Sequence, residues 1–189
     1  EELASLFALV RGGELWDRPP FDTAVPAMRV VRDVAIAGDG EPTACPDFEV
    51  AMETIGGVLE RSGLSVGHGE GIRFNLLTNA TLFHRASVAR GLERFGRLGG
   101  EIWAKLDAGS QEYFERVDGT RLSLDRVVKN IAAAAVNRPL VLQCMFMRID
   151  GQEPTSAEID AWEARLKQIL DVGGQVRLVQ VYTVARRPA

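Results

Sequence analysis

The sequence predicts an α/β fold built on a parallel sheet, and three observations lead to this prediction. Short apolar runs of β type alternate along the chain with segments that repeat apolar residues at helical spacing. Gly and Pro residues mark many of the boundaries between these segments. Strands that alternate with helices form right-handed βαβ units. The expected architecture is therefore a doubly wound sheet or an open barrel.

The first third of the chain predicts one strand between two helices. Apolar residues recur at helical spacing from Leu3 to Val10, and Gly12–Gly13 ends that helix. The proline-rich segment 14–32 predicts an irregular connector. A strand is expected near 33–37, followed by a helix that begins at 46–47 and ends at Gly63.

The remaining two thirds predict four more strands, each with a helix before it. The pattern Thr155-x-x-Glu158 is a helix-capping signal that fixes the start of the last helix. The expected elements are strand 72–78, helix 85–97, strand 101–107, helices 110–117 and 123–136, strand 140–147, helix 156–170 and strand 176–184. Because the series begins on a helix, a strand before residue 1 would complete the alternation, and the chain begins Glu-Glu-Leu rather than with Met. We expect residues 1–189 to form one incomplete domain.

Composition and charge exclude several classes of protein. The net charge of −4 does not favour binding to nucleic acid or to an anionic membrane. No apolar run approaches the ~20 residues of a membrane span. The two cysteines, Cys45 and Cys144, form neither a disulfide framework nor a C-x-x-C site. We therefore expect a cytoplasmic protein with no membrane partner.

The most informative motif is Gly38-Asp39-Gly40-Glu41-Pro42-Thr43, which directly follows the strand predicted near 33–37. Two glycines allow a sharp turn and a close approach of the backbone to a ligand. Glu41 is expected just past the carboxyl end of a strand, where α/β sheets and barrels bind their ligands. The alternative is a tight turn with a solvated glutamate.

Polar residues interrupt four successive strands that should be apolar if they are buried on both faces. An unpartnered buried polar group costs roughly 1–3 kcal/mol, so these side chains need one another, water or a ligand. One interpretation is an internal hydrogen-bond network in which Lys105 pairs with Asp107. The other is a polar ligand on the concave face of the sheet, which the positions of Glu41, Asn79 and Asp107 at strand ends favour. The polar residues are Asn75, Thr78, Asn79, Lys105, Asp107, Gln143, Gln180 and Tyr182.

Taken together, these segments resemble the radical S-adenosylmethionine superfamily and its partial (β/α)6 barrel. The segment 38–43 looks like the family's glycine-glycine-glutamate motif, and Leu77-Thr78-Asn79-Ala80-Thr81 looks like its "T-N-G" strand end. The segment 103–108 resembles the fourth strand. The segment 179–186 resembles the last strand of a poorly characterised subgroup related to tRNA wyosine-synthesis enzymes.

The sequence departs from the family pattern at three places. Asp39 stands where the motif has its first glycine, and Ala80 stands where "T-N-G" has glycine. The C-x-x-x-C-x-x-C loop, which follows the first strand in the family, is absent. We expect that the first strand and this loop are missing from the chain, which by itself would then bind no cluster and be inactive.

The resemblance implies an enzyme that, in its complete form, cleaves S-adenosylmethionine reductively with a [4Fe–4S] cluster and begins radical chemistry on an unknown substrate. It implies an electron donor such as flavodoxin or ferredoxin. The cofactor contacts it implies are Gly38, Asp39, Gly40, Glu41, Pro42, Thr78, Asn79, Lys105, Asp107, Gln143, Gln180 and Tyr182, with no metal ligand and no assigned catalytic acid or base.

Two other functions are compatible with the sequence. A barrel that lost the cluster loop could serve as a non-catalytic binding module. A metal-independent α/β enzyme could act through Lys105 and Asp107. An RNA contact is a further option for the arginines of one predicted helix, Arg90, Arg94 and Arg97, with Arg85 nearby; the alternative is a solvated helix face.

Overall fold

The computed structural model describes residues 1–38, 40–63 and 71–184. Its five strands form one sheet in the order β1-β2-β3-β4-β5, and every neighbouring pair is parallel. The strands are β1 (Asp33–Ile36), β2 (Arg73–Thr78), β3 (Glu101–Lys105), β4 (Leu140–Met145) and β5 (Val176–Tyr182). The predicted α/β fold with a parallel sheet is confirmed, and each predicted strand is present with both ends within two residues of those expected.

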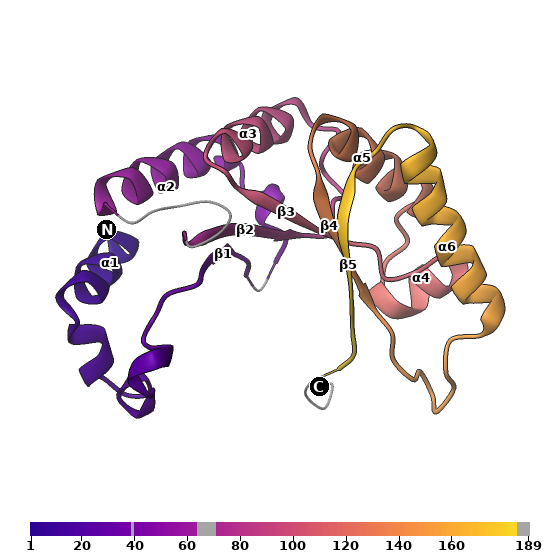
Figure 1. Cartoon of the computed structure of the whole chain (residues 1–189). Helices are drawn as coiled ribbons and strands as arrows, with labels where there is room; N and C mark the ends of the chain where they lie inside the picture. The colour runs from indigo at the N-terminus through magenta and orange to yellow at the C-terminus, as the bar shows by residue number, and fades with distance from the viewer. Residues whose placement is uncertain (39, 64–70, 185–189) are drawn as a thin grey trace.

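The strand order selects the open barrel over the doubly wound sheet. Each crossover moves one strand in the same direction, and right-handed crossovers that never reverse direction place their helices on one face. Figure 1 shows α2, α3 and α5 on the same side of the sheet. The α-helices are α1 (Glu2–Gly12), α2 (Phe48–Ser62), α3 (Ala86–Arg97), α4 (Gln111–Asp118), α5 (Leu124–Asn137) and α6 (Ser156–Asp171). The arrangement is that of a partial (β/α) barrel.

The connector predicted over 14–32 consists of three short 3₁₀ helices, η1 (Glu14–Asp17), η2 (Phe21–Thr23) and η3 (Pro26–Met28). A fourth, η4 (Pro42–Ala44), follows β1. The N-terminal helix α1 packs against α2 at the β1 side of the sheet. Among the described residues, no helix has the length and apolar character that a membrane span requires.

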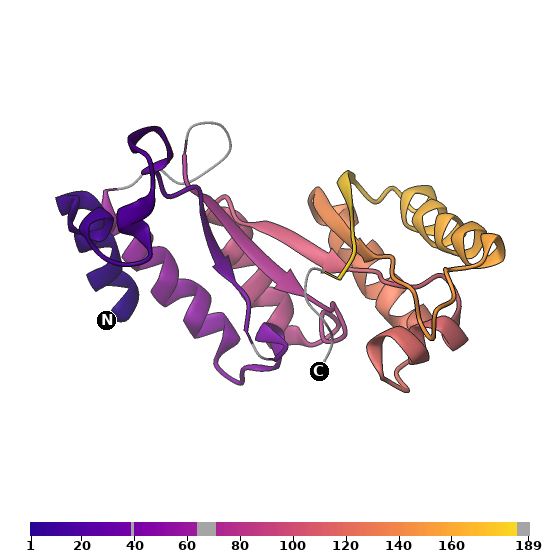
Figure 2. The same cartoon turned by 90° about the horizontal axis from the view of Figure 1, so that it is seen from below.

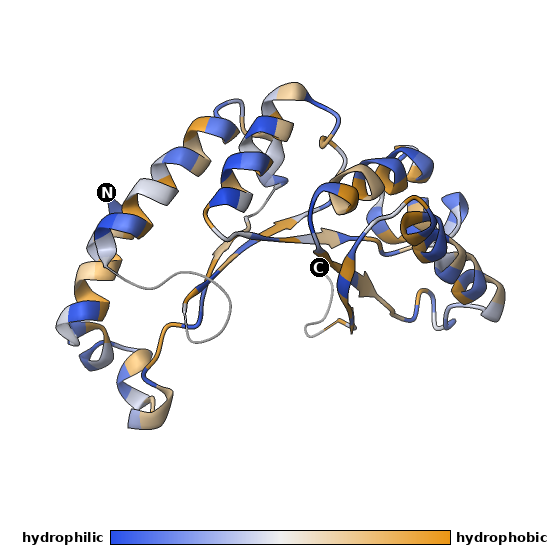
Figure 3. Ribbon diagram, turned by 45° about the horizontal axis from the view of Figure 1, so that its top comes forward, coloured by the Kyte–Doolittle hydropathy of each residue, from blue (hydrophilic) through white to orange (hydrophobic). Residues whose placement is uncertain are grey.

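Strand alternation separates an apolar face from a polar face. Leu76, Ile102, Ala104 and Leu142 are fully buried under the helices, and Phe74 stacks at 4.7 Å, centroid to centroid, on Phe95 of α3. The residues between them point to the opposite face of the sheet. Figure 2 shows the sheet from that side. Figure 3 shows hydrophilic and hydrophobic residues alternating along the helices, as expected of helices with one face on a sheet.

Candidate functional site

A groove of about 530 Å³ lies at the carboxyl ends of β1–β5, on the polar face of the sheet. Its lining includes most of the residues that the sequence singled out: Gly38, Gly40, Glu41, Pro42, Thr78, Asn79, Lys105, Gln143 and Tyr182. Asp107 and Gln180 lie next to the groove but do not line it. Asp39 is outside the described residues. The parallel register explains this convergence, because it brings the carboxyl ends of all five strands to one edge.

Glu41 joins the loop after β1 to the end of β2. Its Oε1 atom accepts hydrogen bonds from Thr43 N (3.1 Å), Thr43 Oγ1 (2.5 Å) and Thr78 Oγ1 (2.6 Å), and its Oε2 atom accepts one from Asn79 N (2.8 Å). A carboxylate offers about four acceptor positions, two on each oxygen. Oε2 therefore retains room for another donor. No cation among the described residues lies within ion-pair distance of Glu41.

The turn after β2 holds a residue other than glycine in a left-handed conformation. Ala80 has a left-handed backbone with φ of +58°, and its side chain is fully buried. Glycine adopts this conformation without steric cost, so the position suits the glycine of "T-N-G". The Asn79 side chain is committed to this turn, because its Oδ1 atom accepts hydrogen bonds from Thr81 N (3.1 Å) and Thr81 Oγ1 (2.7 Å). Asn79 therefore reaches the groove through its backbone more than through its amide.

The glycines of the motif have a different role from the one their conformational freedom suggested. Neither Gly38 nor Gly40 has positive φ, so the turn itself does not require glycine at either position. A Cβ atom on either residue would meet no atom of the described residues within 4 Å. Both residues line the groove. Their missing side chains therefore leave space in which a ligand can approach the backbone.

Lys105 is the centre of a charged cluster at the β3 end of the groove. Its Nζ atom lies 2.9 Å from Asp107 Oδ2 and 3.9 Å from Asp118 Oδ1. Burial alone would lower the pKa of Lys105, but the attraction of Asp107 outweighs burial and raises it. The Asp107 side chain is completely buried, and its Oδ1 atom accepts a hydrogen bond from Met145 N at 2.7 Å. The predicted pairing of Lys105 with Asp107 is confirmed.

Gln143 and Asn75 also have partners inside the protein, although the Asn75 Oδ1 atom is buried without one in the described structure. Gln143 donates from Nε2 to Gln180 Oε1 at 2.8 Å, and Asn75 donates to Asp33 Oδ1 at 2.9 Å. Burial, with a contribution from Asp107, raises the pKa of Tyr182. The two interpretations of these residues are thus compatible, since a bonded network forms one wall of an open groove.

Asp118 belongs to this cluster, and the sequence did not single it out. It ends α4, and its side chain is 24% exposed. Burial, followed by the repulsion of Asp107, raises the pKa of Asp118 to about 6. In the sequence, an aspartate at a helix end before glycine has the pattern of an ordinary surface residue. Only the return of α4 toward β3 brings it to Lys105.

We expect Asp118→Asn to stabilise the protein at pH 8 and to have little effect at pH 4. The folded pKa of about 6 is above the ordinary value of 3.8, so this carboxyl contributes stability below pH 4 that is lost as pH rises through 6. The amide avoids this loss by up to about 3 kcal/mol, since one pKa unit corresponds to about 1.4 kcal/mol. Urea unfolding at both pH values tests this, and equal effects at pH 4 and pH 8 would contradict it.

The arginines considered for RNA lie in ion pairs. Arg90 Nε lies 2.8 Å from Glu49 Oε2, and Arg94 contacts both Glu49 (3.4 Å) and Glu53 (3.2 Å) across the α2–α3 interface. The hydrogen bond from Arg90 lowers the pKa of Glu49. These pairs account for much of the charge on this helix face without a nucleic acid.

The thiols and carboxylates of the described chain do not form a metal centre. No group of three His, Cys, Asp or Glu residues in the described ranges is arranged to hold a metal ion. Cys45 is exposed beside the groove, whereas Cys144 is buried on the helix side of β4, where burial raises its pKa to about 12. These residues therefore do not fit a [4Fe–4S] cluster, which needs several thiolates.

Comparison with solved structures finds distant likenesses. No protein-family model matches the sequence, and no curated protein matches it. A solved structure that matches is that of a domain of pyruvate-formate lyase-activating enzyme from Bacteroides vulgatus ATCC 8482. The likeness has 14% sequence identity and a TM-score of 0.41, and it covers 78% of this chain and 98% of that chain. At this distance it carries no information about activity.

Proposed function

We propose that the groove binds S-adenosylmethionine and that the chain is the cofactor-binding part of a radical S-adenosylmethionine enzyme. The main support for this proposal is the Glu41 carboxylate, which lines the groove. Its Oε2 atom can accept a further hydrogen bond, and it has no cationic partner among the described residues. An ammonium group satisfies that capacity with a charge-assisted hydrogen bond. The methionyl ammonium of S-adenosylmethionine is such a group.

The rest of the groove supports the same ligand. A volume of about 530 Å³ is within the usual range of small-molecule sites. Lys105 shares its charge with Asp107 at one end of the groove and has further N–H donors for a ligand carboxylate. The open sides of Gly38 and Gly40 leave room beside Glu41. Glu41 lines the groove, and Asp107 and Asp118 lie beside Lys105 just outside it. Three carboxylates near one lysine suit a ligand with an excess of positive charge.

The chemistry assigned to these residues is binding and orientation. When bound in such enzymes, the cofactors supply the radical chemistry. Because the described residues do not fit the cluster, we assign them no step of that chemistry. The substrate, the electron donor and any RNA partner stay expectations from the resemblance.

Glu41→Gln is expected to lower the affinity for S-adenosylmethionine about 10- to 100-fold. The amide keeps the shape of the side chain but loses a charge-assisted hydrogen bond, a type that contributes roughly 1.5–3 kcal/mol, and each 1.4 kcal/mol is tenfold in affinity. Calorimetric titration of the chain with S-adenosylmethionine measures the change. Glu163→Gln, on the exposed side of α6, makes the same substitution away from the groove and serves as the control.

A second variant separates ligand binding from folding. A Cβ on Gly40 meets no protein atom, so Gly40→Ala should leave the melting temperature unchanged and still weaken binding by occupying the space beside Glu41. Unaltered affinity in both Glu41→Gln and Gly40→Ala, with wild-type protein that binds S-adenosylmethionine, would place the ligand elsewhere. Absence of binding by the wild-type chain would overturn the proposal itself.

A further inference from the structure

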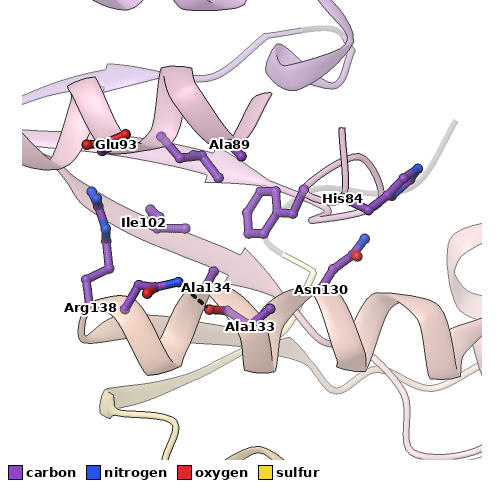
Figure 4. Close-up of a pocket in the computed structure, with 11 residues that line it drawn as sticks. His84, Ala89, Glu93, Ile102, Asn130, Ala133, Ala134 and Arg138 are labelled. Carbon is purple, nitrogen blue, oxygen red and sulfur yellow. Dashed lines mark hydrogen bonds between the residues drawn. The ribbon is translucent and has the colours of Figure 1, made fainter. Parts of the chain in front are cut away.

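A second cavity lies on the opposite face of the sheet, between α3 and α5. Its volume is about 600 Å³, and Phe83, Leu92 and Ile102 give it an apolar floor. Figure 4 shows Ala89 and Glu93 of α3 across the cavity from Ala133, Ala134 and Arg138. Ile102 points toward the helices, whereas its strand neighbour Lys105 lines the groove described above. The two sites are therefore separated by the sheet.

Arg138 is an unpaired cation at one end of this cavity. Its Nη1 atom is buried without a hydrogen-bond partner in the described structure. Within the described ranges, no carboxylate lies within ion-pair distance of its guanidinium; the neighbouring Glu93 pairs instead with Arg97 at 3.3 Å. Burial accordingly lowers the pKa of Arg138.

The guanidinium is held in place by the absence of a side chain on α3. It packs directly over Gly96, where a Cβ atom would overlap with it. In the described structure Nη1 makes no hydrogen bond to the carbonyl groups at that end of α3, where Phe95 O and Gly96 O accept from Gly100 N and Gly99 N. A buried N–H left without a partner costs about 1–3 kcal/mol, and more for a charged group. Arg138 is only partly buried as a residue, so an anion that pairs with the accessible side of its guanidinium offsets part of the cost of burying the charge.

The cavity is also lined by Glu93, His84 and two amides, and the amides are already bonded within the protein. Asn130 donates from Nδ2 to the carbonyls of Ala80 (2.8 Å) and Thr81 (3.1 Å), and Asn137 donates from Nδ2 to Ala133 O (2.9 Å). Both Nδ2 atoms thus donate to carbonyls of the protein. Arg138 is left as the group that binds the charged end of a ligand, and the apolar floor contacts the apolar part of the ligand.

We propose that the cavity between α3 and α5 binds a small organic monoanion whose carboxylate pairs with Arg138 and whose flat apolar body lies over Phe83, Leu92 and Ile102. The volume and the mixture of an apolar floor with one orienting charge are typical of small-molecule sites. The site is independent of the proposed S-adenosylmethionine groove, and neither requires the other.

Benzoate is the probe for this site, and benzamide is its neutral counterpart of the same shape. In ¹H–¹⁵N spectra of the 20.6 kDa chain, benzoate should shift the amides of Ala89, Ile102, Ala133 and Ala134 in a saturable manner. Benzamide should bind at least about tenfold more weakly, because it has no negative charge to pair with that of the guanidinium. Arg138→Met, which keeps the bulk of the side chain, should weaken benzoate about tenfold or more and leave benzamide unchanged.

Arg18→Met is the matched control, since Arg18 is an exposed arginine of the N-terminal connector; it should bind benzoate like the wild type. The comparison of benzoate with benzamide on the wild-type chain needs no variant, so it decides the question even if Arg138→Met folds poorly. Equal affinities for the two probes, or shifts confined to the residues of the other groove, would overturn the proposal.

Discussion

Replacing Asp107 by alanine is expected to destabilise the protein by about 3–5 kcal/mol, the largest effect of any single change at the site. Its completely buried carboxylate pairs with Lys105 and accepts the Met145 N–H. Removal leaves a half-buried ammonium with only the more distant Asp118 and leaves a buried amide without an acceptor. Breaking one side of a buried ion pair costs this much because the other charge stays desolvated. Urea unfolding followed by circular dichroism measures the loss.

Two further variants test this explanation. Asp125→Ala removes an exposed carboxylate, 64% accessible and paired with Arg165, and should cost no more than about 1 kcal/mol. The double variant Asp107→Ala/Lys105→Met should be more stable than Asp107→Ala alone, because it removes the stranded ammonium. If the double variant were less stable than the single one, the stranded charge would not be the cause.

Gly109→Ala is expected to be nearly as severe, with a loss of about 3 kcal/mol or more. An added Cβ would lie 2.7 Å from Trp162 Cα, and closer still to Trp162 N and Ala161 C of α6. These are backbone atoms, which have no side-chain rotation by which to move away. Overpacking usually costs 1–3 kcal/mol and costs more where nothing can move. For a chain of this size, about 3 kcal/mol corresponds to a melting temperature about 6–12 °C lower.

The expected damage extends to the groove, because Gly109 belongs to the loop between β3 and α4. Gly109 N and Ser110 Oγ both donate at 2.5 Å to the Glu158 carboxylate of α6. A displaced loop also moves Asp118, which ends α4, away from Lys105. Gly38→Ala is the matched control, since a Cβ there meets no protein atom. A melting temperature like that of the control would show that the loop and α6 can separate at little cost.

Glu158 shows what a local sequence pattern can and cannot predict. Thr155-x-x-Glu158 predicted the start of α6, and the Thr155 side chain does accept a hydrogen bond from Glu158 N at 3.2 Å. The Glu158 carboxylate, however, binds the β3–α4 loop and not the Thr155 N–H of a complete capping box. The pattern therefore predicted the helix boundary, while a contact about fifty residues away decided the partner of the carboxylate.

The sequence by itself determined the strands, the helices and the edge of the sheet at which Glu41, Thr78 and Lys105 meet. These follow from apolar periodicity and from turn residues, which act over a few neighbours, and from the rule that parallel strands share a carboxyl edge. Glu41 was singled out by its place after a strand, and it does line the groove.

Only the tertiary structure decided that the sheet is an open barrel, because strand order depends on which strands pair and not on any local pattern. It also decided that Asp118 joins Lys105, that Asn79 is committed to its own turn, and that Arg138 is left without an anion beside a second cavity. Each of these depends on which helix or loop packs beside a given residue. The sequence does not show which groups surround a charged side chain. Burial and ion pairing set the free energy of that charge, and both depend on the folded structure.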